Sequence, residues 1–176
     1  MLFKNEGLMV RKLQAKDNHL LVKWLSDPMV LEFYEGRDNS FVLEKVNKLF
    51  YNAGNDKVGC MVTYQGVNIG YIQYYPLDER TCKIYHYDGV ENIYGIDQFI
   101  GETDYWNRGI GTQLVKSMVE YLFNQMGAER VVMDPQTSNK RALRSYEECG
   151  FKRVRMLPKH ELHEGEYRDC WLMEYS

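Results

Sequence analysis

Trp106-Asn107-Arg108-Gly109-Ile110-Gly111-Thr112 is the stretch that decides the fold of this 176-residue chain. It follows a strand-like run, Ile93 to Ile100, and precedes a helical stripe of apolar residues that stops at Gly127. The stripe consists of Leu114, Val115, Met118, Val119 and Leu122. The two glycines therefore lie at the N-terminus of a predicted helix.

This turn predicts an anion site. The start of a helix leaves several N–H groups unpaired and carries partial positive charge, and glycine lets a ligand approach the backbone closely. Such a turn suits a diphosphate, bound by Gly109, Gly111 and Thr112, with Arg108 as a cation at the mouth. A tight turn that merely starts a helix is the alternative, and two glycines alone would favour it.

Two better-known phosphate loops do not match. No Lys-Ser/Thr pair follows Gly111, which excludes a Walker loop. A Rossmann fingerprint fits poorly, because a third glycine is missing at the right spacing and the turn is far from the first strand.

Outward from the turn, the pattern predicts a mixed α/β fold around a central sheet. Helices are predicted after Asp17, ending at Asp27-Pro28, after Ser40 and after Asn139. The second has Val42, Val46 and Leu49 inward. Polar stretches at 76–92 and 158–169 predict loops, the former with a ragged strand as the alternative. Strands are predicted at 9–15, 58–64, 67–75, 93–100, 130–134, 151–156 and 170–175.

Composition narrows the function classes. The absence of linkers and repeats predicts one domain over residues 1–176. A net charge of −3 argues against a nucleic-acid binder, and no apolar run is long enough to span a membrane. Met1 to Glu6 lacks the pattern of a secretory signal, so we expect a cytoplasmic protein.

The cysteines and histidines do not predict a metal site. Cys60, Cys82, Cys149 and Cys170 are widely spaced and form no CxxC pair, which argues against a disulfide framework or zinc. The segment His160 to Glu164 is similar to HExxH, but its second histidine falls one position early.

The glycine turn resembles motif A of the GNAT superfamily, written Q/R-x-x-G-x-G/A, with Trp106 at the usual Gln/Arg position. Asn139, Ala142 and Tyr146, followed by Gly150-Phe151, resemble motif B. The resemblance implies the GNAT fold, with a central mixed, mostly antiparallel sheet flanked by about four helices. It also implies acetyl-CoA as cosubstrate and no metal.

A closer resemblance, to the aminoglycoside 6′-N-acetyltransferases, spans nearly the whole chain. Its most specific segments are Tyr94 to Gly101 and Met133-Asp134-Pro135. Leu31 to Tyr34, His160 to Gly165 and Asp169 to Tyr175 add to it, and the similarity is greatest to the acetyltransferase half of the bifunctional acetylating and phosphorylating enzyme. It implies direct attack, in a ternary complex, by the 6′-amine of a kanamycin- or tobramycin-like antibiotic on acetyl-CoA, which confers resistance.

Asp97 and Tyr146 are the catalytic candidates. Aspartate is depleted in strands, yet Asp97 lies among core-like residues, and its role would be to hold the substrate ammonium and accept its proton. Tyr146 would donate a proton to the leaving thiolate, with packing as the alternative role. The backbone near Phe99 and Ile100 would contact the pantetheine arm, and Asn139, the predicted cap of the motif B helix, would also bind the cofactor, as would Tyr146.

A polycationic sugar needs carboxylates and flat surfaces. Asp134, Glu161 and Asp169 are the further carboxylate candidates, although a solvated loop is the alternative for the last two. Tyr34 and Tyr74 are candidates for stacking, with packing an equal alternative. Two other functions stay open: a GNAT enzyme acting on a protein N-terminus, a polyamine or another small amine, and a non-catalytic CoA-binding module.

Overall fold

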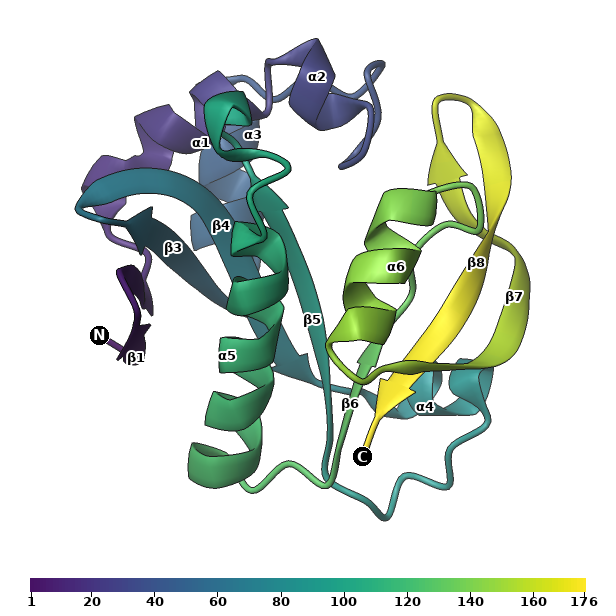
Figure 1. Cartoon of the computed structure of the whole chain (residues 1–176). Coiled ribbons are helices and arrows are strands. Elements are labelled where there is room, and N and C mark those ends of the chain that lie inside the picture. The colour runs from purple at the N-terminus through teal and green to yellow at the C-terminus, as the bar shows by residue number, and fades with distance from the viewer.

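An eight-stranded sheet forms the centre of the computed structural model, which describes all residues from Met1 to Ser176 (Figure 1). The strand order is β1-β2-β3-β4-β5-β6-β8-β7, and every neighbouring pair is antiparallel except β5 with β6. The sheet is therefore mixed and mostly antiparallel, as predicted. The strands are β1 (Phe3–Asn5), β2 (Leu8–Lys12), β3 (Val58–Tyr64), β4 (Val67–Pro76), β5 (Ile93–Ile100), β6 (Arg130–Met133), β7 (Lys152–His163) and β8 (Glu166–Tyr175).

Helices cover both faces of this sheet. They are α1 (Asn18–Trp24), α2 (Pro28–Leu31), α3 (Leu43–Val46), α4 (Glu79–Tyr85), α5 (Ile110–Gln125) and α6 (Lys140–Glu148). Short 3-10 turns at Ala15–Asp17 and Thr103–Tyr105 and a π-helical turn at Asn47–Tyr51 complete the elements. None of the helices combines the length and the apolar character that a bilayer crossing requires.

Two hydrophobic clusters lie on opposite faces of the central strands. The predicted apolar stripe of α5 is buried in the larger cluster, together with Ile72 and Tyr74 of β4. Tyr71, which alternates with them along β4, packs with Trp24 and other residues of α1–α3 in the second cluster. Alternation along β4 therefore separates an α5 face from an α1–α3 face.

The sheet divides where its only parallel pair ends. β5 and β6 pair only between Ile93–Gly95 and Arg130–Val132, and β5 then continues to Ile100 without a partner on that side. In Figure 1 the two strands part toward the top, with α5 on one side of the opening and α6 on the other. This splay leaves backbone groups of β5 available to a ligand.

Several boundaries differ from the sequence-based predictions. The stretch 76–92 contains α4, and 158–169 is a β7–β8 hairpin with its turn at Glu164-Gly165. Strand β1 was not predicted. Asp27-Pro28 begins α2, because Asp27 accepts a hydrogen bond from the backbone N–H of Met29.

Two predicted helix starts, at Asp17 and after Ser40, also need correction. Asp17 does not cap α1, because its carboxylate binds Arg11 and the backbone N–H of Gln14. After Ser40, Val46 is buried as predicted, but Val42, the N-cap of α3, and Leu49, in the π-helical turn that follows α3, are exposed.

Candidate active site

The glycine turn opens directly onto a cleft. Gly109 is the N-cap of α5 with a φ of +75°, a left-handed conformation that favours glycine. A Cβ built on Gly109 or on Gly111 would meet no atom within 4 Å, so both residues face open space. The first amides of a 16-residue helix thus point toward a region that an anion can enter.

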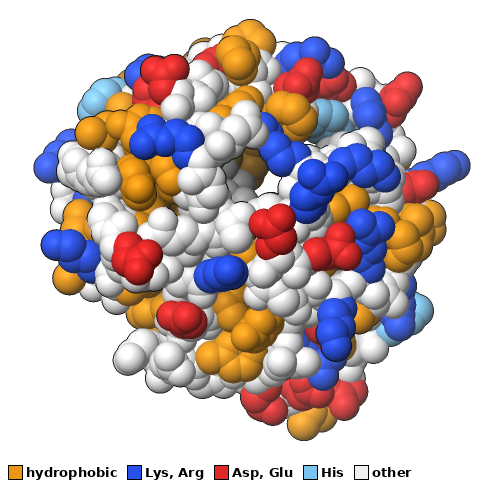
Figure 2. Space-filling model, in the orientation of Figure 1, with side chains coloured by type: hydrophobic (Ala, Val, Ile, Leu, Met, Phe, Trp, Pro, Cys, Tyr) orange, Lys and Arg blue, Asp and Glu red, His pale blue; other side chains and the backbone are white.

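The cleft has a volume of about 480 Å³ and lies between α5 and α6, at the point where β5 leaves β6. Figure 2 shows this face of the molecule hollowed, with Lys and Arg side chains along the rim. Seven of the eight predicted cofactor-binding residues line the cleft, namely Phe99, Ile100, Gly109, Gly111, Thr112, Asn139 and Tyr146. The residues fit a diphosphate-bearing coenzyme, because the two glycines leave the helix mouth open and arginines stand beside it.

The eighth residue, Arg108, lies beside the glycine turn but outside the cleft lining. Its guanidinium lies over the ring of Tyr105 at 5.0 Å, and the side chain does not line the cleft. Arg141 and Arg144 of α6 line it instead. Arg141 and Arg144 are three positions apart in the helix that Asn139 caps. This spacing, visible in the sequence, places both side chains on one side of α6.

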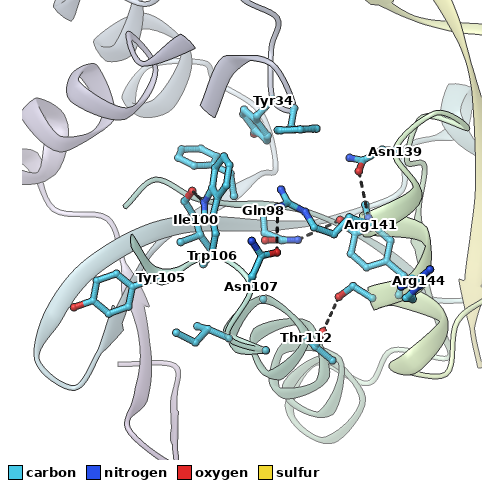
Figure 3. Close-up of a pocket in the computed structure, with 18 of the residues that line it drawn as sticks. Tyr34, Gln98, Ile100, Tyr105, Trp106, Asn107, Thr112, Asn139, Arg141 and Arg144 are labelled. Atoms are coloured by element: carbon cyan, nitrogen blue, oxygen red, sulfur yellow. Dashed lines mark hydrogen bonds between the residues drawn. The ribbon is translucent and has the colours of Figure 1, made fainter. Parts of the chain in front are cut away.

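Trp106, the departure from the motif, has a clear partner. Its indole Nε1 donates to the carbonyl of Ile100 at 2.8 Å, and the Arg141 guanidinium lies 4.9 Å from its ring centre. Arg141 also lies over Phe33, 5.1 Å from its ring centre. Figure 3 shows Arg141 extending from α6 toward Trp106. A cation from α6 thus stands beside the position where the family motif usually carries Gln or Arg.

The free edge of β5 faces the cleft. Because the Ile100 carbonyl binds Trp106, the main-chain groups of Ile100 point away from β4. Backbone groups alternate along a strand, so those of Gln98 point the same way. These groups have no ladder partner, because β6 ends its pairing at Val132. They are suited to the amides of a pantetheine arm.

Tyr146 reaches the cleft from α6 with its hydroxyl fixed. The Gln98 side-chain amide donates to the Tyr146 hydroxyl oxygen at 3.2 Å. The phenolic proton is therefore left free for another acceptor. Burial raises the pKa of Tyr146 to about 12, so the group stays protonated at neutral pH.

Asp97 lies on the other face of β5. It is partly buried, and its Oδ2 accepts a hydrogen bond of 2.8 Å from the Gln73 side chain. Burial, and then the neighbouring Asp134, raise the pKa of Asp97 to about 6. Tyr34 packs against Phe99 of the α1–α3 face, with tilted rings whose centres are 4.6 Å apart, and it lines the cleft; its contact with the substrate stays a prediction.

Asp134 follows β6 and is held by two side chains. The Tyr85 hydroxyl donates to its Oδ2 at 3.0 Å, and His160 Nε2 lies 2.9 Å from the same oxygen. The hydrogen bond with Asp134 raises the pKa of His160. His160 therefore serves as an ion-pair partner, and no group of three or more metal-ligating side chains is arranged around it.

The last two predicted substrate contacts, Glu161 and Asp169, differ in their surroundings. Glu161 accepts a hydrogen bond from Gln136 at 2.8 Å, and loss of solvation and nearby Asp134 raise its pKa, so it extends the acidic surface. Asp169 is exposed and accepts from the backbone N–H of Lys159, which assigns it to the β7–β8 hairpin.

The prediction for Tyr74 is wrong. It is only 4 % exposed and packs against Tyr94 and Tyr121 on the α5 face. Strand alternation turns Gln73 and Tyr75 toward Asp97 instead. The sequence signal for this is the two-residue spacing of Ile72 and Tyr74, which are buried together in the cluster on the α5 face.

The two catalytic candidates thus lie on opposite faces of one strand. Asp97 faces α1–α3, whereas Gln98 binds Tyr146 on the α6 side. Both reach the place where β5 and β6 part, so a group on the unpaired β5 edge would have Asp97 on one side and Tyr146 on the other. This arrangement suits transfer between two molecules that enter from different sides of the sheet.

Comparison with known proteins gives the same picture. Residues 14–158 match the family described as "Acetyltransferase (GNAT) domain". An "Aminoglycoside N(6')-acetyltransferase type 1" from Klebsiella pneumoniae is 28% identical over 152 residues, which cover 85% of this chain and 76% of that protein.

Solved structures extend the similarity to the whole fold. The crystal structure of aminoglycoside acetyltransferase AAC(6′)-Ib in complex with coenzyme A and kanamycin has a TM-score of 0.77 and 26% identity, covering 96% of this chain and 94% of that one. A spermidine N-acetyltransferase from Vibrio cholerae has a TM-score of 0.80 at 17% identity, covering 97% and 96%, and shares the fold.

Proposed function

The chain belongs to the GNAT acetyltransferase family, and from that premise we propose that it transfers the acetyl group of acetyl-CoA to the 6′-amine of kanamycin-like aminoglycosides. The observation that carries this proposal is the row of carboxylates, Asp97, Asp134 and Glu161, beside the coenzyme cleft. A polycationic amine is the acceptor that such a row favours. The relatives named as aminoglycoside acetyltransferases support the same acceptor.

The chain's residues supply the binding of both substrates. The amides of the α5 mouth, with Arg141 and Arg144, would hold the diphosphate, and the β5 edge at Gln98 and Ile100 would hold the pantetheine arm. Acetyl-CoA, when bound, supplies the acetyl group as a thioester. The tyrosine and carboxylate surfaces on the other face of β5 would orient the sugar rings.

Asp97 and Tyr146 manage the two protons of the reaction. Asp97, ionised above a pKa of about 6, would anchor the substrate ammonium and take up its proton as the amine attacks. Tyr146, with its oxygen already bound by Gln98, would donate its proton to the leaving sulfur. No covalent acyl-enzyme is needed, because Cys149 is buried and burial raises its pKa to about 11.

The extent and the compartment of the enzyme are part of the proposal. Because strands from β1 to β8 share one sheet, we propose that residues 1–176 form one acetyltransferase domain. The cytoplasm is the proposed compartment, since all four cysteines are unpaired.

The test is a CoA-release assay in which kanamycin, spermidine and an acceptor peptide are compared with acetyl-CoA. We expect the highest kcat/KM with kanamycin and, by NMR, an acetyl group on the 6′-nitrogen. A matched pair of aminoglycosides that differ only in an amine or a hydroxyl at 6′ is the control, and only the amine should react. Preference for spermidine or the peptide, or acetylation at another nitrogen, would refute the proposal.

A further inference from the structure

A chain of two hydrogen bonds ends on Asp97. The Tyr71 hydroxyl donates to Gln73 Oε1 at 2.7 Å, and Gln73 Nε2 donates to Asp97 Oδ2 at 2.8 Å. All three residues lie on the α1–α3 face of neighbouring strands, and Gln73 stands directly opposite Asp97 in the β4–β5 register. The chain therefore runs from the core to the acceptor side of the site.

The Tyr71 hydroxyl fixes which end of the Gln73 amide faces Asp97. An amide oxygen only accepts hydrogen bonds and the amide nitrogen only donates them. With the hydroxyl proton directed to Oε1, the NH2 group must point to the carboxylate. A flipped amide would place two acceptor oxygens together unless Asp97 were protonated.

Tyr71 is itself held in place. It is 2 % exposed, and its ring packs on Phe50 at 5.1 Å and on Phe99 at 5.7 Å. Gly59 provides the space for its hydroxyl, because a Cβ at that position would lie 2.8 Å from the oxygen. Gly59 also pairs with Gln73 across β3 and β4. The missing side chain of Gly59 thus leaves the space that the Tyr71 hydroxyl needs to reach Gln73.

We propose that Gln73 is a positioning residue that, with its amide orientation set by Tyr71, holds the Asp97 carboxylate ionised and directed toward the acceptor amine. The inference rests on the proposed function for the identity of the acceptor. Strand β4 would thus take part in the chemistry together with the glycine turn and the motif B helix.

Asp97 needs such a donor because its surroundings otherwise favour the neutral acid. Asp134 from the end of β6 is the like charge that faces it, whereas Lys57, before β3, and the Tyr75 hydroxyl favour its ionised form. Other titratable side chains near it are Tyr34, Tyr71, Tyr85 and Tyr146. Tyrosines stay neutral at the working pH, so Gln73 and Lys57 are the principal groups that oppose burial and Asp134.

The hydrogen bond from Gln73 favours the ionised form of Asp97, and this determines the direction in which the pKa of Asp97 changes when the bond is removed. Gln73 donates to the ionised carboxylate and so lowers a pKa that burial has raised to about 6. Removal of the donor raises that pKa further. Activity that requires ionised Asp97 is lost as pH falls through this value, so the acidic limb of the rate profile moves to higher pH.

The experiment compares wild type with Gln73→Leu in two measurements. The first is the pH profile of kcat/KM for kanamycin, in which we expect the acidic limb to move up by about one pH unit, the size of a charged hydrogen bond. The second is an NMR titration of the ¹³C-labelled Asp97 carboxyl carbon without substrate, in which the same upward shift is expected. The KM for acetyl-CoA should not change.

Further variants keep the test decisive. Tyr71→Phe, which leaves the amide free to flip, should move both midpoints in the same direction by a smaller amount. Gln125→Leu, the same change at an exposed position at the end of α5, should move neither. Wild-type profiles in Gln73→Leu and Tyr71→Phe would overturn the inference. Failure of the wild type to acetylate kanamycin would instead overturn the proposed function, and the NMR titration would still test Gln73.

Discussion

Asp97 combines two properties that conflict in water: it carries a charge, and it lies partly buried beside a second carboxylate. For this single residue, the combination of charge and burial favours proton transfer. A carboxylate with a pKa near 6 accepts a proton far more readily than an ordinary aspartate does, and it still binds a cation at neutral pH.

Asp97→Asn removes both properties while it retains size. We expect kcat/KM for the aminoglycoside to fall by about 100-fold or more, the usual contribution of a positioned proton acceptor. Acetyl-CoA binding, measured by calorimetry, should remain as in wild type, because Asp97 does not line the coenzyme cleft. Turnover near the wild-type rate would remove Asp97 from the mechanism.

Tyr146→Phe tests the proton donor. The variant loses the hydroxyl that accepts from Gln98, at a cost of about 1 kcal/mol in the free energy of unfolding. The kcat should fall by about 100-fold, because the leaving thiolate loses its proton source. Steady-state kinetics and thermal unfolding separate the two effects, and a loss of stability with an unchanged kcat would assign Tyr146 to packing alone.

His160→Asn tests the ion pair with Asp134 through pH. Since the pair raises the pKa of His160 in the folded protein, its stabilisation is fully present below the unfolded pKa and is lost as pH rises through the folded pKa. His160→Asn should therefore lower Tm more at pH 5.5 than at pH 8.5. The effect should stay below about 1 kcal/mol, because both side chains are partly solvated. An equal loss at both pH values would mean that the contact is only steric.

At the scale of elements, α5 is the part of the molecule that the local sequence specifies most fully. Its apolar positions are buried as the periodicity predicts, and its glycine mouth faces the cleft. Helix α6 is similar, since Asn139 accepts from the backbone N–H of Ala142 at 3.2 Å as a cap.

Gly111→Ala separates ligand access from folding at the α5 mouth. Within the protein the new methyl group meets no atom within 4 Å, and alanine favours a helix over glycine by about 0.5–1 kcal/mol. The variant should therefore unfold at the same or a higher temperature. The same methyl group projects into the cleft, so the Kd for CoA should rise at least about tenfold by calorimetry. Unimpaired CoA binding would show that the diphosphate lies elsewhere.

Elements with few apolar residues were harder to predict. Helix α4 buries only Cys82 and Tyr85, too few to reveal a helical period, although Asp78 accepts from the N–H of Thr81 as a cap. In β7 and β8 most residues near the hairpin turn are exposed, so alternation is weak and the segment resembles a polar loop. Cross-strand hydrogen bonds, which the sequence does not display, extend both strands.

At the scale of the whole molecule, one ion pair joins the N-terminal loop after α2 to the C-terminal hairpin. Arg37 Nε and Nη2 bind the Glu164 carboxylate at 2.5 and 2.7 Å, and the Arg37 backbone N–H adds a third bond of 3.0 Å. This loop carries Tyr34, and the β7 strand of the hairpin carries Glu161. The contact thus links the loop after α2 to the β7–β8 hairpin, which both lie at the top of the molecule in Figure 1.

Charge reversal tests this link. Arg37→Glu should raise the KM for the aminoglycoside several-fold with little change in the KM for acetyl-CoA, because repulsion from Glu164 moves the loop away from the hairpin. The double variant Arg37→Glu with Glu164→Arg should recover part of the loss, since the backbone contact is not restored. Equal KM values in all three proteins would show that the acceptor surface does not depend on this contact.

The sequence by itself determined the elements whose signals are local: the α5 stripe with its glycine mouth, the capped α6, and the β3–β4 hairpin. Periodicity, caps and turn residues act over a few positions, so they can be read without the rest of the chain. The tertiary structure alone decided which residues meet across elements. It put Gln73 rather than Tyr74 beside Asp97, supplied Arg141 in place of Arg108, and set Asp97 and Tyr146 on opposite faces of β5, because strand register and packing between distant segments fix where side chains point.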